Sequence, residues 1–63
     1  MDPAEFRAIR KDLGLTQTEL AAVMGYSSQP VISAIENGGS VPALPERLIR
    51  AYEDGYRPDD WPG

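Results

Sequence analysis

Two helices and the turn between them can be recognised in residues 14–38, which read GLTQTELAAVMGYSSQPVISAIENG. The first helix is predicted to start at Thr16-Gln17-Thr18-Glu19, because a threonine followed three residues later by a glutamate is a capping box. Leu15 and Leu20 stand at the two positions of a hydrophobic staple around that start. Gly25 is the predicted end, since glycine readily adopts the left-handed backbone that closes many helices.

A second helix is predicted directly after a short turn. Ser28 is its expected N-cap, although Ser27 would also serve, and in either case Pro30 falls in the first helical turn, where no intrahelical donor is needed. Val31, Ile32 and Ile35 are its apolar positions. Residues 37–39, Asn-Gly-Gly, suit a left-handed turn at its end.

One further helix is predicted on each side of this pair. The earlier one starts at Asp2-Pro3-Ala4-Glu5, which combines an N-cap acid, a proline at the first position and a capping-box glutamate, and it runs to about Asp12, with Gly14 as its stop. The later one is placed from about Pro45 to Asp54, because the prolines at 42 and 45 exclude a helix interior. One side of this helix is expected to carry Leu44, Leu48, Ala51 and Tyr52.

The chain is therefore predicted to be a compact all-α domain of four helices, or five, over residues 1–55. Residues 56–63 have no helical period and form the predicted C-terminal tail. At 63 residues the domain buries only about 60% of its unfolded surface, so a partner chain would help its stability. The expected core consists of Phe6, Ile9, Leu13, Leu20, Ile32, Ile35 and Leu48.

The composition argues against an enzyme and against a metal or cofactor site. The chain contains no cysteine and no histidine, so it lacks thiolate ligands, the thiol nucleophile and the commonest general base. Asp54, Asp59 and Asp60 are too irregularly spaced to indicate a cation site. A hydrolase would have no nucleophile–base pair to use.

The motifs of residues 14–38 resemble those of the Cro and phage-repressor (XRE-like) helix-turn-helix family. The resemblance is carried by residues 14–21, then Gly25, then Ile32-Ser33-Ala34-Ile35-Glu36-Asn37-Gly38, and it extends over about residues 3 to 54. It implies a repressor-like fold in which the helix after the turn enters the major groove of DNA. The family commonly has one residue fewer between the glycine and the cap, so the turn is interpreted as a one-residue insertion, which leaves the register of the first recognition turn open by one position.

The resemblance implies roles for individual residues. Gln17 matches a glutamine that binds phosphate and reaches the recognition helix, and Asn37 matches a phosphate-binding asparagine. Arg10 and Glu36 match an ion pair between the first and third helices, and that pairing is also expected because Ile9 and Ile35 must be buried together. Gln29 is expected to contact an adenine edge, and Val31 and Ala34 thymine methyl groups. The full set of predicted DNA-binding residues is Arg10, Thr16, Gln17, Ser28, Gln29, Pro30, Val31, Ser33, Ala34, Asn37 and Ser40.

Charge is the observation that disfavours DNA binding. Six Lys and Arg against ten Asp and Glu give a net charge of −4, whereas nucleic-acid-binding domains are usually basic. Residues 38–40, Gly-Gly-Ser, also stand where many family members have Lys or Arg. The alternative is a protein-interaction module, antitoxin-like or a transcription cofactor, that kept the fold and lost DNA affinity.

The predicted function is that of a sequence-specific transcriptional regulator, a repressor acting on double-stranded DNA, with no small-molecule substrate. A homodimer is expected, through the last helix and the tail with Tyr52, Tyr56 and Trp61, although Trp61 could instead fold back over its own core. Phosphate-neutralising cations are expected among Arg7, Arg10, Lys11 and Arg47. The acid at position 2 and the lack of a long apolar run predict a cytoplasmic location, in a bacterial cell or a phage-infected host, away from any membrane.

Overall fold

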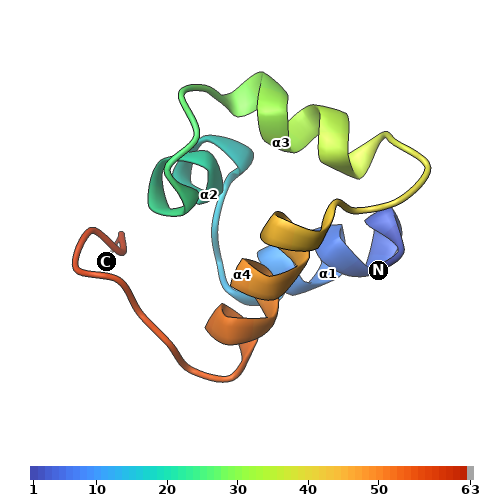
Figure 1. Cartoon of the computed structure of the whole chain (residues 1–63). Coiled ribbons are helices and arrows are strands. Elements are labelled where there is room, and N and C mark those ends of the chain that lie inside the picture. The colour runs from blue at the N-terminus through green and yellow to red at the C-terminus, as the bar shows by residue number, and fades with distance from the viewer. Residues whose placement is uncertain (63) are drawn as a thin grey trace.

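The computed structural model describes residues 1–62 and folds them into four helices without a strand (Figure 1). The helices are α1 (Pro3–Asp12), α2 (Gln17–Met24), α3 (Gln29–Glu36) and α4 (Ala43–Glu53). The predicted all-α class with four helices is confirmed. Figure 1 shows α3 at one side of the molecule, next to α2, with α1 and α4 on the other side.

The starts of the first two helices follow the predicted capping signals. Asp2 is the N-cap of α1 as predicted and accepts a hydrogen bond from the Ala4 amide at 2.8 Å, but the capping box predicted there is wrong, because Glu5 forms an ion pair with Arg50 instead. At α2 both halves of the capping box are present, because Thr16 accepts from the Glu19 amide and Glu19 accepts from the Thr16 amide. Local sequence therefore determines where α1 and α2 begin.

The turn between α2 and α3 depends on one glycine. Gly25 has a φ of +87°, a left-handed conformation that residues with a side chain rarely adopt. It ends α2, and the chain enters α3 three residues later through Ser28, whose backbone is extended. The predicted cap at Ser28 is correct, although its hydroxyl makes no capping hydrogen bond.

Two predictions about helix ends are wrong. Residues 37–39 form no left-handed turn, since Asn37 has a φ of −104° and the two glycines that follow it also lack positive φ angles. The Asn37 side chain satisfies the helix end instead, by donating to the Ser33 carbonyl at 2.9 Å. Helix α4 begins at Ala43, two residues before the predicted Pro45, because a proline in the first turn removes no intrahelical hydrogen bond.

The core lies where the apolar sides of all four helices meet. Its buried residues are Phe6, Ile9, Leu15, Leu20, Ala21, Val23, Ile32, Ile35, Val41, Ile49 and Tyr52. Leu13 and Leu48, both predicted core residues, are only partly buried against it. Leu44 is 62% exposed, whereas Tyr52, which was predicted on the same side of α4, is buried; the buried residues of α4 are Pro45, Ile49 and Tyr52.

Tyr52 connects α4 to the end of α2. Its hydroxyl donates to the Val23 carbonyl, one of the carbonyls that the end of α2 leaves without an intrahelical partner. Burial raises the pKa of Tyr52 above its ordinary value, so the hydroxyl keeps the proton that it donates.

The tail folds back against the same tyrosine. Trp61 meets the Tyr52 ring edge-on with the centroids 5.2 Å apart, and Arg57 lies over the Trp61 ring at 4.3 Å. Arg57 also donates to the Tyr52 carbonyl at 2.6 Å, near the end of α4. Of the two alternatives for Trp61, the structure therefore has it folded back over its own chain. Residue 63 of the predicted tail lies outside the described residues.

We predict that Trp61 reports this tail contact in solution. It is the chain's single tryptophan, and its emission should be blue-shifted from that of free tryptophan at every protein concentration. Trp61→Ala should lower the melting temperature by about 4–8 °C, because losing an aromatic pair of roughly 1 kcal/mol matters in a small domain. An emission maximum that shifts only on concentration would instead show that a second chain orders the tail.

Candidate nucleic-acid interface

Helix α3 presents a largely uncharged surface away from the core. Ile32 and Ile35 point into the core, whereas Pro30, Ala34 and Asn37 are exposed. Among them lie the half-buried Gln29, Val31 and Ser33. We call the predicted contact residues of this surface, 28–31, 33, 34 and 37, the α3 face. It offers amide, hydroxyl and methyl groups, which are the chemical partners of base edges in a major groove.

The N-terminus of α3 adds free donors to one end of this face. The Ser28 hydroxyl makes no capping bond, and the Gln29 amide has no intrahelical acceptor, whereas Pro30 has no amide hydrogen and the Val31 amide donates to the Ser28 carbonyl. A helix N-terminus with a free amide and a free hydroxyl favours an anion such as a phosphate. Ser28 and the amide of Gln29 are therefore available to a phosphate group.

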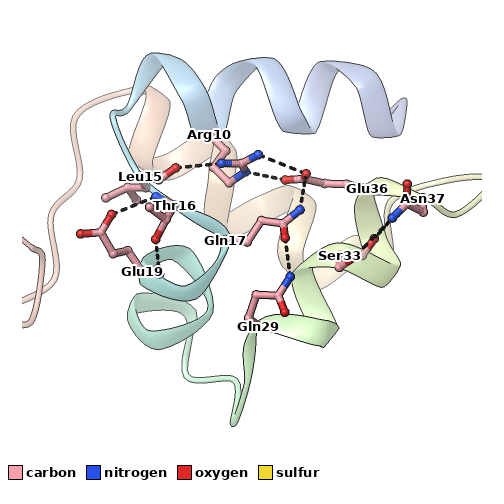
Figure 2. A network of polar contacts seen from close by, with 9 residues as sticks. All are labelled: Arg10, Leu15, Thr16, Gln17, Glu19, Gln29, Ser33, Glu36 and Asn37. Atoms are coloured by element: carbon pink, nitrogen blue, oxygen red, sulfur yellow. Dashed lines mark hydrogen bonds and ion pairs between the residues drawn. The ribbon is translucent and has the colours of Figure 1, made fainter.

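A buried ion pair fixes α3 to α1. The Arg10 Nε donates to Glu36 at 2.6 Å and one of its terminal nitrogens donates to the other carboxylate oxygen at 3.2 Å (Figure 2). The other terminal nitrogen donates to the Leu15 carbonyl at 2.9 Å, just before α2. The two side chains are only 9% and 4% exposed. The predicted Arg10–Glu36 pair is thus present, and it also holds the start of α2.

Gln17 extends this network from α2 to the α3 face. Its side-chain nitrogen donates to Glu36 at 2.9 Å, and its side-chain oxygen accepts from the nitrogen of Gln29 (Figure 2). The expectation that Gln17 reaches the recognition helix is correct. A continuous line of polar contacts therefore runs from Arg10 in α1 through Glu36 and Gln17 to Gln29.

The ion pair also explains how α3 can carry an acid, Glu36, and still approach phosphates. Glu36 would repel phosphates if its charge faced solvent alone, but its carboxylate is occupied by Arg10 and Gln17. No other residue of α3 is charged. At the start of α2, Glu19 is held by the Thr16 amide as part of the capping box. The candidate interface is thus nearly neutral in spite of the acidic balance of the chain.

The structure brings most of the predicted site residues together and separates two of them. Arg10 is buried and all three of its side-chain nitrogens donate within the protein. Arg10 therefore cannot contact DNA or neutralise a phosphate, contrary to the prediction from the sequence. Ser40 is exposed in the loop after α3, outside the helical face. Thr16 is exposed at the N-cap of α2, and the Asn37 side chain donates to the end of its own helix.

Two contacts were not predicted from the sequence. The Arg10 bond to the Leu15 carbonyl has no sequence signal, because any residue supplies a carbonyl. The contact between Gln17 and Gln29 joins residues twelve positions apart. The only sequence feature that could have indicated this contact is the glutamine at the first position of both α2 and α3.

Comparison with protein families gives one match. The family model described as helix-turn-helix matches residues 6–50, which include α1, α2, α3 and most of α4. No curated protein and no solved structure matches the chain. Within residues 1–62 no helix is both long enough and apolar enough to cross a membrane, and no three or more His, Cys, Asp or Glu side chains there are grouped so that they could hold a metal ion.

We predict that the Arg10–Glu36 pair dominates the stability of this domain. Arg10→Ala should lower the free energy of unfolding by about 3–5 kcal/mol, because it leaves the Glu36 charge buried without a partner. A domain of this size has roughly that much stability in total, so circular dichroism should show a largely unfolded protein at room temperature.

The exposed pair between Arg50 and Glu5 provides a matched control. Its side chains are 44% and 47% exposed, and such pairs contribute little. Arg50→Ala should therefore leave the melting temperature nearly unchanged. Equal melting temperatures for the Arg10 and Arg50 variants would contradict the special role of the buried pair.

Proposed function

The chain belongs to the XRE-like helix-turn-helix family of DNA-binding regulatory domains, and from this premise we propose that it is a repressor that binds a near-palindromic operator as a homodimer. The observation that supports this proposal most directly is the α3 face, which carries base-reading groups and no uncompensated acid. In the proposed complex the N-terminal half of α3 lies in the major groove. Gln17, Ser28 and Asn37 position the domain on phosphates, with Thr16 and Ser40 at its margins.

Base recognition is assigned to the α3 face itself. Gln29 contacts an adenine through its side-chain amide, and Val31 and Ala34 contact thymine methyl groups. Pro30 packs beside them, and Ser33 contacts a neighbouring base or phosphate. Such contacts are specific for A·T pairs, because the face has no arginine or lysine for the edge of guanine.

Affinity for DNA of random sequence should be low. Of the six cations, Arg10, Arg50 and Arg57 are engaged within the protein, which leaves Arg7, Lys11 and Arg47 exposed without an ion pair in residues 1–62. Three phosphate contacts per chain would give at most about 2.7 log units of affinity per log unit of salt. The proposed operator binding therefore depends mainly on uncharged contacts.

We predict that selection from a random duplex pool enriches one near-palindromic sequence, with half-sites about 34 Å apart or a multiple of that spacing. Gln29→Ala should weaken binding to the selected site by roughly 1–3 kcal/mol and leave binding to random DNA nearly unchanged. Lys11→Gln is the control, since it should weaken both equally.

The alternative of a protein-interaction module makes the opposite prediction for the same experiment. In that case the pool yields no enriched sequence at low or moderate salt. A Gln29→Ala variant that weakens specific and random binding equally would also count against base recognition by the α3 face. Either result would favour the alternative, in which the α3 face binds a protein and not DNA.

The proposed dimer uses the outer side of α4. Leu44 at the start of the helix is 62% exposed and Tyr56 just after it is 58% exposed, and they are the large apolar residues that residues 1–62 leave most open. In an antiparallel pair of α4 helices about a two-fold axis near residue 50, Leu44 of one chain lies opposite Tyr56 of the other. Tyr52, which the sequence placed in this interface, is buried in its own chain and is left out.

We predict that Leu44→Glu prevents dimerisation without unfolding the domain. Sedimentation equilibrium should show the unaltered chain as a dimer and the variant as a monomer, while both keep the same helical circular dichroism. Binding to a single half-site should persist, and binding to the full palindrome should weaken. Ala8→Glu on the exposed side of α1 is the matched control and should remain dimeric. A dimeric Leu44→Glu variant would exclude this surface.

A further inference from the structure

We infer that Glu36 is a positioning residue for base recognition: its carboxylate sets the orientation of the Gln29 side-chain amide, and thereby the preference of the α3 face for adenine over guanine. This inference rests on the proposed function, because it concerns how the same face discriminates between bases. It assigns a role in specificity to a residue that touches no DNA. Figure 2 shows the contacts that connect the ion pair to Gln29.

The contact between Glu36 and Gln17 fixes the orientation of the Gln17 amide. A carboxylate has acceptors and no donor, so the side-chain group that faces it must be the nitrogen of Gln17, at 2.9 Å. Arg10 holds both carboxylate oxygens, through bonds of 2.6 and 3.2 Å, and so prevents Glu36 from turning away. The amide of Gln17 therefore has one permitted orientation.

Gln17 transfers that orientation to α3. With its nitrogen at Glu36, Gln17 turns its side-chain oxygen towards Gln29, and an oxygen of this kind only accepts hydrogen bonds. The group of Gln29 that meets it must be the nitrogen, as is observed. The charge of a buried acid thus fixes which side of the Gln29 amide faces the protein and which atoms remain for a ligand.

The atoms of Gln29 that Gln17 leaves free decide which base it can bind. One N–H of Gln29 is used by Gln17, which leaves the other N–H and the oxygen. Adenine presents an acceptor, N7, beside a donor, the N6 amino group, and it can bind both. Guanine presents acceptors at both N7 and O6, so the fixed oxygen of Gln29 would meet O6 without a proton between them. If Gln29 were free to turn its oxygen towards Gln17, both of its N–H groups would remain, and it could donate to N7 and O6 of guanine.

The test compares binding to the selected site with binding to the same site carrying guanine for the adenine that Gln29 contacts. The unaltered protein should prefer adenine by about 5- to 150-fold. In Glu36→Gln the new amide can donate or accept, so both orientations of Gln17 and Gln29 become available and the ratio should fall to within about threefold. Circular dichroism confirms that the compared proteins are folded.

A second variant avoids the buried ion pair. Gln17→Met leaves Arg10 paired with Glu36 and removes the connection to Gln29 together with the phosphate contact proposed for Gln17. It should therefore weaken binding to both duplexes and reduce the adenine preference to the same extent as Glu36→Gln, even where Glu36→Gln fails to fold. Glu36→Asp, which keeps the carboxylate, should retain more of the preference than Glu36→Gln. Lys11→Gln should weaken both duplexes equally and leave the ratio unchanged.

The outcomes separate the two proposals. If the random pool yields no enriched sequence, the proposed function fails and this inference fails with it. If the unaltered protein prefers adenine while folded Gln17→Met keeps the full preference, operator recognition stands and the positioning role of Glu36 is overturned. A preference for guanine at this position would overturn both the positioning role and the adenine contact proposed for Gln29, while operator binding itself would stand.

Discussion

The buried ion pair between Arg10 and Glu36 is the interaction on which the other features depend. Arg10 extends from α1, Glu36 lies in the last turn of α3, and the same guanidinium reaches the carbonyl of Leu15 before α2. Three helices are therefore oriented by one side chain. Charges so little exposed are costly to remove from water, and this cost is offset only when every donor and acceptor finds a partner. Within residues 1–62 no buried side-chain polar atom lacks one.

An apolar pair of similar volume could stabilise the domain equally well, but it would not orient its neighbours. Leucine or methionine in these positions would offer Gln17 neither donor nor acceptor, and its amide could then take either orientation. The carboxylate of the charged pair favours the orientation in which the nitrogen of Gln17 faces Glu36. The oxygen of Gln17 then faces Gln29 and fixes the orientation of that side chain on α3. The interaction that joins the helices is therefore also the one that organises the candidate interface.

Features set by neighbouring residues could be predicted from the sequence, and features set by packing could not. The starts of α1 and α2 and the turn at Gly25 are local, and they lie where the sequence placed them. The start of α4 was misplaced because a proline in the first turn is compatible with either boundary. The exposure of Leu44 and the contact between Gln17 and Gln29 depend on how helices cross, which periodicity alone does not determine.

The negative net charge is compatible with DNA recognition once the positions of the charges are considered. Net charge governs long-range attraction, whereas docking depends on the groups at the contact surface, and the one acid of α3 is neutralised inside the protein. Acids elsewhere repel DNA of any sequence, and three free cations compensate little of that repulsion. Uncharged contacts from the α3 face must then provide most of the binding free energy. Such contacts form only on a matching sequence, so a domain of this charge is expected to bind its operator modestly and other DNA very weakly.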